Sequence, residues 1–482
     1  MPITITVHRW MRFCIPFIVL GLSSITALFT GQSYAQDSPL LSPPMDAKTF
    51  RISSTGREVQ VNTSAIIYNN IVDEYFVVWS GTRRDDETSE IYSRRMSVDG
   101  QVIGTDDARI STMGPDGDGG YLAGSPHGAY NDTANEYMIV WAGNDTEDRV
   151  WEIYGQRLNA VGQEIGSDDF RISILEPEEA VAYAGIQPRV TYNSDANEYL
   201  VVWTGLKGLS IMSDEVDIYG QRLDATGQLI GPRSFRISDM APDGFGIEPD
   251  VNYNGVSDEY MVVWAGRNNG RDVNIHGQRL NAVGQEIGPN DFRISDSVPA
   301  PEDENDRSPK LAHNQTTNEY LVVWERNMAF VGAEIEIYGR RLDAAGQSMG
   351  LRDVRISDMG PEGNDEYDAL DPKVTYNEIV NEYLVVWDGE DVHTDGTEIN
   401  DIYGQRLTER GQEIGLNDFR ISDMGSSGYS SFANVVYHSV RNEYLVTWTG
   451  SYTDFSDNEI YGQRLTTEDV RRWYSVHLPF IQ

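Results

Sequence analysis

Carboxylates on glycine-rich segments are the residues of this chain best suited to binding a cation. Asp116 and Asp118 lie two residues apart in the segment Asp-Gly-Asp-Gly-Gly, and a hard cation such as calcium prefers oxygen ligands on a loop of this kind. A looser cluster contains Glu362, Asp365 and Asp368. The first segment lacks the third ligand and the distal glutamate of a complete calcium loop. We therefore predict that the protein requires no cofactor and that these five residues are its candidates for binding Ca²⁺.

The sequence contains none of the common catalytic motifs. It has no HExxH segment, no GxSxG nucleophile segment, no phosphate-binding loop and no SxDxGxTW segment. Its one cysteine, Cys14, lies in the apolar N-terminal segment. Paired carboxylates for glycoside cleavage stay open, because acidic residues are abundant and their separation cannot be read from the sequence. We therefore assign no catalytic residue.

An apolar segment that ends in tryptophan occurs seven times, as in NEYLVVW at 197–203, with 60 to 63 residues between copies. A segment such as PRVTYN precedes each copy, and segments such as IYGQRL and FRIS follow it. Each is short, rich in β-branched and aromatic residues and bounded by Gly, Asn or Asp, which is typical of strands. Four strands in a unit of this length are typical of a propeller blade. The closing tryptophans are Trp79, Trp141, Trp203, Trp264, Trp324, Trp387 and Trp448.

The order of these segments predicts that the array closes into a ring. The FRIS-like segment also occurs seven times, but its first copy, at 50–53, precedes the first unit, and the seventh unit lacks one. Residues 47–53 can therefore supply the outer strand of the last blade, which would also hide an open sheet edge. We predict an all-β fold: a closed seven-bladed β-propeller of four-stranded blades over residues 47–465, with the last blade completed by the N-terminal FRIS strand.

These residues resemble a family of repeats in secreted bacterial proteins, whose units share an EYLVVW-like strand, IYGQR and an FRIS-like strand. The resemblance covers nearly all of the chain after the N-terminal segment. It implies a propeller module of an exported or surface protein. It supplies no catalytic residues.

The segments that flank the repeats predict export. Residues 1–35 have a short basic start, an apolar run and a small-residue cleavage site at Ser33-Tyr34-Ala35, as in a signal peptide; a retained membrane anchor is the alternative. Residues 36–46 are then a linker and residues 466–482 a C-terminal tail. The formal net charge of −39 repels nucleic acids and anionic membranes. We expect a secreted or cell-surface monomer with no nucleic-acid partner and no membrane insertion after cleavage.

Loop lengths predict which face of the propeller is functional. The first-to-second and third-to-fourth strand connections have constant lengths, whereas the other two connections of each blade vary, and variable loops carry function more often. The fourth-to-first loops on the variable face contain 20 Asp or Glu and one Arg. Loop aromatics there could stack on a ligand or simply anchor the loops. These candidates are Tyr121, Tyr183, Phe245, Tyr367 and Tyr429.

Three functions are consistent with this pattern. The main hypothesis is a non-catalytic binding module that contacts a glycan or protein at the cell surface through its acidic variable face, with calcium assisting. The alternatives are an extracellular polysaccharide hydrolase or lyase on a propeller scaffold, and a structural spacer. The repeated glutamates and arginines are expected to pair and fix strand register, because one catalytic site would not recur in seven blades.

Overall fold

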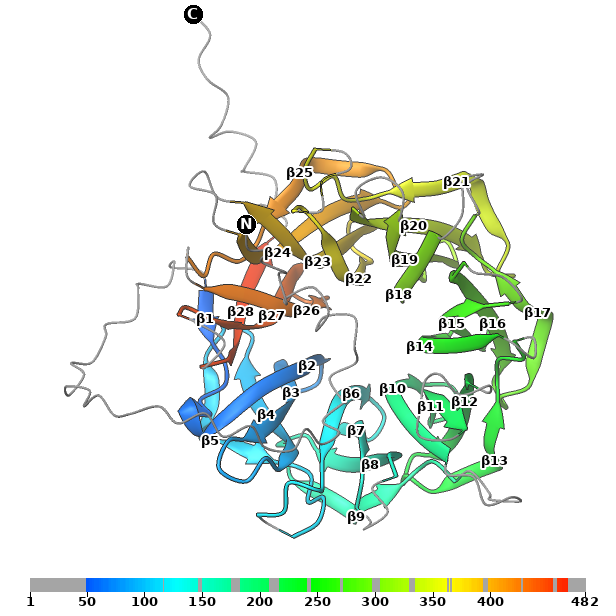
Figure 1. Ribbon diagram of the computed structural model, residues 1–482. Coiled ribbons are helices and arrows are strands. Elements are labelled where there is room, and N and C mark those ends of the chain that lie inside the picture. Colours follow the sequence, from blue (N-terminus) through cyan, green and yellow to red (C-terminus); the bar gives the residue numbers. More distant parts are fainter. Residues whose placement is uncertain are drawn as a thin grey trace, which may run out of the picture. The chain divides into compact units, whose positions relative to one another are not determined.

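The computed structural model describes residues 49–466 and is built almost entirely of β-strands arranged as a ring of seven blades (Figure 1). The one helical element in the described part is the short 3₁₀ turn η2 (Gly56–Glu58). No helix of the described residues is long and apolar enough to span a bilayer. The predicted signal peptide, linker and most of the C-terminal tail lie outside the described residues. Within 49–466 the structure does not describe 116, 146–149, 175–182, 208–215, 241–243, 269–271, 297–303, 329–333, 362–363, 365, 393–397, 426–427 and 454–456.

Each blade is a four-stranded antiparallel sheet, and in blades 1 to 6 the four strands lie side by side in chain order. The inner strands are β2 (Val59–Asn69), β6 (Ala123–Asn131), β10 (Tyr183–Asn193), β14 (Phe245–Asn254), β18 (Glu304–Asn314), β22 (Ala369–Asn377) and β26 (Tyr429–His438). The second strands are β3 (Glu74–Arg83), β7 (Glu136–Gly143), β11 (Glu198–Lys207), β15 (Glu259–Arg267), β19 (Glu319–Met328), β23 (Glu382–Val392) and β27 (Glu443–Ser451). The third strands are β4 (Ser89–Ser97), β8 (Glu152–Asn159), β12 (Val216–Asp224), β16 (Asn274–Asn281), β20 (Ile335–Asp343), β24 (Glu398–Thr408) and β28 (Glu459–Thr466). The outer strands are β5 (Val102–Arg109), β9 (Glu164–Arg171), β13 (Leu229–Arg236), β17 (Glu286–Arg293), β21 (Ser348–Arg355), β25 (Glu413–Arg420) and β1 (Thr49–Arg51).

The ring closes as predicted. The inner strands contact one another in a complete cycle, from β2 through β6, β10, β14, β18, β22 and β26 back to β2. The N-terminal strand β1 pairs antiparallel with β28, with Thr49 opposite Gln463 and Arg51 opposite Tyr461. The last blade therefore takes its outer strand from the beginning of the chain, and the seven-bladed all-β prediction is confirmed.

The second strands are apolar throughout because they are covered on both faces. Tyr, Val and Trp of one blade pack against the residues that alternate with them in the preceding blade. Thus Tyr199, Val201 and Trp203 of β11 form one cluster with Met138 and Val140 of β7. The same arrangement recurs at every blade boundary, and all seven closing tryptophans are 0 % exposed. The hydrophobic core is therefore seven equivalent layers between blades.

The first-to-second strand connections, which have a constant length, share one backbone conformation. In all seven blades the residue before the second-strand glutamate has a positive φ of 53 to 57°, and it is always Asn or Asp. These two residue types tolerate the left-handed region better than other non-glycine residues. The repeated Asn/Asp-Glu-Tyr sequence is thus the turn between first and second strands. These residues are Asp73, Asn135, Asn197, Asp258, Asn318, Asn381 and Asn442.

The repeated glutamates and arginines pair within blades, as predicted. Arg95 of β4 binds Glu74 of β3 at 2.6 Å, and Arg464 binds Glu443 at 2.5 Å. The same pair forms in the other five blades. Because the pair joins the ends of the second and third strands, it fixes their register.

A carboxylate latch joins the outer strands of blades 1, 2, 4, 5 and 6 to the preceding blade, and in blade 3 the Ser234 hydroxyl takes its place. Asp169 of β9, for example, accepts a hydrogen bond from the backbone N–H of Thr112, which follows the outer strand of blade 1, at 2.6 Å. Asp291 and Asp418 make the same contact, and each of the three leaves its Oδ1 without a hydrogen-bond partner among the described residues. Burial raises the pKa of Asp169 and Asp418 to about 7 and that of Asp291 to about 6.

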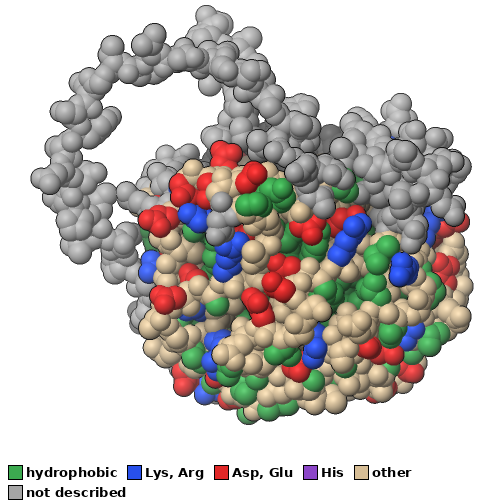
Figure 2. Space-filling view, turned by 90° about the horizontal axis from the view of Figure 1, so that it is seen from below, with side chains coloured by type: hydrophobic (Ala, Val, Ile, Leu, Met, Phe, Trp, Pro, Cys, Tyr) green, Lys and Arg blue, Asp and Glu red, His purple; other side chains and the backbone are tan. Residues whose placement is uncertain are grey.

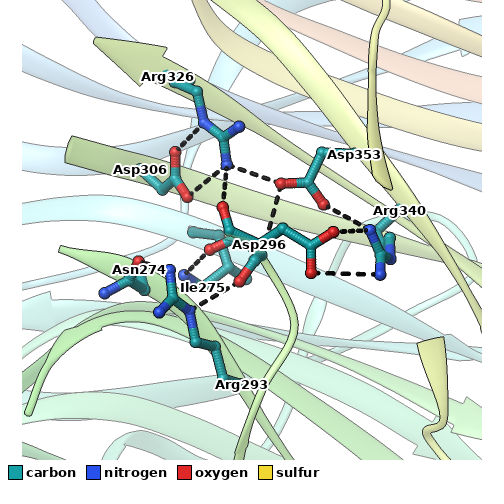
Figure 3. Close-up of polar contacts among 9 residues, drawn as sticks. Asn274, Ile275, Arg293, Asp296, Asp306, Arg326, Arg340 and Asp353 are labelled. Carbon is teal, nitrogen blue, oxygen red and sulfur yellow. Dashed lines mark hydrogen bonds and ion pairs between the residues drawn. The ribbon is translucent and has the colours of Figure 1, made fainter. Parts of the chain in front are cut away.

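In blades 1 and 5 an arginine donates to the Oδ1 atom of the latch carboxylate. Blades 2, 4 and 6 have a glutamine in the third strand beside the latch, whereas blades 1 and 5 have Arg94 and Arg340. Arg94 donates to Asp107 Oδ1 at 2.5 Å, and Arg340 donates to Asp353 Oδ1 at 3.1 Å. Figure 3 shows the blade 5 version, in which Arg326, 1 % exposed, joins the same network.

The latches predict a pH dependence of stability. Because the folded-state pKa of Asp169, Asp291 and Asp418 is raised above the unfolded value of about 4, their contribution is present when they are protonated and is lost as the pH rises through 6 to 7. The triple variant D169N/D291N/D418N, which stays neutral, should melt at the wild-type temperature at pH 4 and about 2–4 °C above it at pH 8. Thermal unfolding followed by circular dichroism measures this.

Asp107→Asn is the matched control. Its carboxylate is already paired with Arg94, so this substitution should lower the melting temperature at pH 8. A triple variant that melts below the wild type at pH 8 would show that the three latches are ionised without penalty.

Candidate functional site

The calcium candidates are only partly described. Asp116, Glu362 and Asp365 lie outside the described residues. Asp118 Oδ1 accepts a hydrogen bond from the Gly120 N–H at 3.0 Å, and the buried Asp368 accepts one from the Ile335 N–H at 2.9 Å. Among the residues that are described, no three His, Cys, Asp or Glu are grouped to hold a metal ion. Calcium binding stays a prediction.

The five candidate aromatics lie at the starts of five different blades. The rings of Tyr121 and Tyr367 pack on Gly114 and Gly360, where an added Cβ atom would lie 2.3 Å from the ring, so glycine is required there. These two rings thus anchor their loops, while the 7 % exposure of Tyr429 leaves little area for stacking. The remaining two are Phe245, which lies under the Arg267 guanidinium at 5.0 Å, and Tyr183, which begins β10. Ligand stacking on these aromatics stays a prediction.

A different set of residues stands out once the strand register is known. One position of the inner strand lies opposite the residue before each closing tryptophan, and it carries a different kind of side chain in nearly every blade. We call this set the axial ring. It consists of Ala65, His127, Arg189, Asp250, Lys310, Lys373 and Asn434.

A β-bulge positions the axial ring. In six inner strands the register shifts immediately before the ring residue, as between Ile186 and Arg189, and in β2 it shifts one residue earlier. In five blades a proline, such as Pro188, precedes the ring residue and lies in the bulge, where its missing N–H costs no ladder hydrogen bond. A bulge bends the strand and re-aims the following side chain. Because the inner strands line the centre of the ring (Figure 1), the bulge sets the ring residue beside the axis.

Charges of the axial ring act on one another across several blades. Burial lowers the pKa of His127 well below its ordinary value, and the nearby cations Arg189, Lys310 and Lys373 lower it further. These four residues belong to blades 2, 3, 5 and 6, so their side chains converge. On the side of the protein in Figure 2, by contrast, acidic and basic side chains are interspersed in small separate groups.

Three members of the axial ring also bind the inner strand of the next blade. His127 Nδ1 accepts the Val190 N–H at 3.2 Å, and Asp250 Oδ2 accepts the Leu311 N–H at 3.0 Å. Asn434 donates to the Ser64 carbonyl at 2.9 Å. These contacts hold the inner strands together and fix where the ring side chains lie.

Four carboxylates in neighbouring blades lie beside the axial ring, and we call them the acid arc: Glu248, Glu325, Asp371 and Asp388. Three of them accept N–H groups from the bulge of the following blade. Glu248 accepts from Ser308 at 2.9 Å, and Glu325 accepts from Asp371 at 2.8 Å. Asp388 accepts from Phe432 at 2.7 Å and from Ala433 at 3.0 Å. The bulges therefore position the acid arc as well as the axial ring.

The members of the acid arc differ in protonation. Burial, with smaller contributions from Glu248 and Asp371, raises the pKa of Glu325 to about 7. Burial and then Asp371 raise the pKa of Asp388 to about 7. Burial also disfavours the charged form of Asp371, but the ammonium groups of Lys373 and Lys310 outweigh it and lower this pKa. Lys373 Nζ lies 2.7 Å from Asp371 Oδ1. At pH 7 a carboxyl that keeps its proton about half of the time thus lies beside an ionised one.

The sequence analysis missed this site although its signal was present. Aligning the seven PRVTYN-like segments gives a column that reads Ala, His, Arg, Asp, Lys, Lys, Asn between largely repeated neighbours. The residue after each tryptophan also varies, and it supplies Glu325 and Asp388. Loop lengths alone do not reveal a column that varies within a strand. The axial position of these side chains depends on the bulge, which only the structure reveals.

Comparison with solved structures gives the same fold. A polysaccharide lyase, Uly1, has a TM-score of 0.52 at 10 % identity over 91 % of this chain and 94 % of its own. An α-L-arabinofuranosidase from Fusarium graminearum has a TM-score of 0.48 at 10 % identity, and an α-L-arabinanase from Penicillium chrysogenum has 0.47 at 12 %. Each of these two covers 72 % of this chain and 94 % of its own. No protein-family model and no curated protein sequence matches the chain.

These similarities correct the main functional hypothesis. The polysaccharide lyase is named for cleavage of a glycan and not as a binding module. The prediction of a non-catalytic binding module is therefore wrong as the leading hypothesis, and the alternative, a polysaccharide hydrolase or lyase, is better supported. At these identities the comparison establishes the propeller fold, so any activity has to be argued from the axial residues themselves.

Proposed function

We propose that the protein is an exported enzyme that cleaves polysaccharides by acid–base chemistry at the axial ring and acid arc. One observation carries the proposal: the inner-strand position beside the axis carries a different kind of side chain in nearly every blade, and five of its seven residues are ionisable. A structural role would be met by the same residue in every blade. Diversity at one shared position is what a single asymmetric substrate requires.

Glu325 and Asp371 are the proposed acid and base. Environments that push the pKa values of two neighbouring carboxyl groups apart assign the two roles. Glu325 keeps its Oε1 without a hydrogen-bond partner among the described residues, so its proton is available. Asp371 is held ionised by Lys373 and Lys310. The two are linked directly, because the backbone N–H of Asp371 donates to Glu325.

The chemistry needs both groups at once. In hydrolysis, Glu325 gives its proton to the glycosidic oxygen as the bond from that oxygen to the sugar carbon breaks. Asp371 takes a proton from the water whose oxygen forms the new bond to that carbon. In elimination, the base instead removes a carbon-bound proton, a carbon–carbon double bond forms, and the acid protonates the departing oxygen. Either path breaks one sugar–oxygen bond and needs no bound cofactor.

The resemblance to secreted bacterial repeats and the predicted signal peptide support a location outside the cell, where polysaccharides occur. The similarity to a polysaccharide lyase supports the same substrate class. Calcium binding at the variable face would be an accessory to this function and is not part of the proposed chemistry.

Measuring the cleavage of polysaccharides tests the proposal. The purified full-length protein should release new reducing ends from at least one member of a panel of neutral and acidic polysaccharides, and a heat-unfolded sample should release none. Adding a chelator should leave the rate unchanged, because both proposed catalytic groups are carboxyls. Absence of product from every polymer would overturn the proposal.

A further inference from the structure

Lysine is rare in this chain, and two of the four lysines lie in the axial ring. Only four of the 37 basic residues are lysines: Lys48, Lys207, Lys310 and Lys373. Lys310 and Lys373 occupy the same register position of β18 and β22, opposite Val323 and Val386. The other basic residues are arginines, and most repeated ones pair with a carboxylate of their own blade. Lys373 also pairs within its own blade, with Asp371, whereas Lys310 forms no ion pair with a described carboxylate.

Lys310 is a buried cation with little compensation. Its side chain is 8 % exposed, and its ammonium group donates one hydrogen bond, to the Pro309 carbonyl at 2.9 Å. No carboxylate of the described residues lies within ion-pair distance of its Nζ. An ammonium group has three donors, and burying one without a charged partner is unfavourable. An arrangement of this kind is expected where the missing partner is a ligand.

Two further cations act at the same place. Lys373 and Arg189 are the two positive groups whose fields act most strongly on Lys310, and their repulsion together with burial lowers its pKa to about 8. Lys310 therefore remains mostly charged at pH 7. Arg189 lies 3.9 Å from Asp250 and Lys373 lies 2.7 Å from Asp371, so these two are partly neutralised. Asp250 and Asp371 attract Lys310 without forming an ion pair with it, so Lys310 is the cation of the three that has no direct carboxylate partner.

From these contacts we infer that the substrate is an anionic polysaccharide, whose negative group, a uronate carboxylate or a sulfate ester, binds Lys310 with Lys373 and Arg189 around it. This inference rests on the proposed function and adds its substrate class. A net charge of −39 repels such a polymer, so a local group of cations is needed to admit it. A neutral glycan would leave Lys310 buried and unpaired in the complex.

Affinity electrophoresis tests the inference apart from turnover. The full-length protein is run at pH 7 through gels that contain a polyuronate, the same polymer with its carboxylates reduced to alcohols, or a sulfated neutral glycan. We expect retardation by the polyuronate or the sulfated glycan, which tells the two anions apart, and none by the reduced polymer. Lys310→Met should weaken the retardation at least tenfold, and Lys310→Arg should restore part of it.

The control removes a positive charge elsewhere. Arg410, whose side chain is 74 % exposed on a turn of blade 6, becomes Gln, and R410Q should be retarded like the wild type. Cleavage of a neutral polymer with no retardation by either anion would overturn this inference while the proposed function stands. Retardation that K310M leaves unchanged would also overturn it. Retardation lost in K310M without turnover on any polymer would support the anion site and overturn the proposed enzyme.

Discussion

Replacing Glu325 with Gln is expected to lower kcat on the cleaved polysaccharide by about 10²–10⁴-fold, with a smaller change in KM. The amide keeps an acceptor for the Asp371 N–H, which wild-type Glu325 binds at 2.8 Å, so the bulge of β22 should persist. It cannot donate the proton that the departing oxygen needs. Initial rates on the same polymer, with circular dichroism to check the fold, measure the effect.

The pH profile separates this role from a structural one. Because Glu325 acts when protonated and its pKa is raised to about 7, wild-type kcat should fall as the pH rises through 7. That limb should be absent from the residual activity of E325Q. Glu164→Gln, an exposed carboxylate at the start of β9, is the control and should leave kcat unchanged. A variant E325Q with wild-type kcat would exclude Glu325 as the acid.

Deleting residues 1–53 is expected to lower the melting temperature by about 10 °C or more. The deletion removes β1 and the residue that follows it, Ile52, which is 1 % exposed in the core between blades 7 and 1. It also removes the Ser53 hydroxyl from the Ile460 N–H and from the buried Glu459, which keeps only its donors on Thr55 and Gly56, and losing part of the hydrogen bonding of a buried carboxylate is costly. Thermal unfolding of the truncated and full-length proteins gives the comparison.

A single substitution in the full-length chain gives a reference value for the stability that the deletion removes. Ile52→Ala leaves the strand in place and should cost about 2–5 kcal/mol, as should Ile172→Ala at the same step of blade 2. The deletion should exceed both. If the truncated protein melts at the wild-type temperature, the closure contributes nothing to stability and blade 7 is stable with three strands.

The fold could be predicted because its information is repeated. A wrong interpretation of one NEYLVVW segment would conflict with six others, and the displaced FRIS copy at 50–53 leaves only one way to complete the last blade. The pairing of glutamates with arginines followed for the same reason. Repetition makes such predictions robust, and it does so because each repeat must fit the same neighbours.

The site could not be predicted in the same way, because function here depends on departures from the repeat. Lys310, Asp250 and His127 look like isolated substitutions until the register places them at one position of adjacent inner strands. The protonation of Glu325 and Asp371 depends on burial and on distant neighbours, such as Asp371 for Glu325, 46 residues away in sequence, and Lys310 for Asp371, which no local pattern encodes. Acid content directed the sequence analysis to the loops, whereas the converging charges lie inside the ring.

The pairing of β1 with β28 also sets the order in which this molecule is completed. Thr49 and Gln463 are 414 residues apart, so the first strand to be synthesised waits for the last. Blades 1 to 6 contain their own four strands and can form as local units, whereas blade 7 needs both ends of the chain. Contacts of such long sequence separation form slowly. We expect ring closure to be the final and rate-limiting step of folding, during which the outer edge of β28 is exposed to other chains.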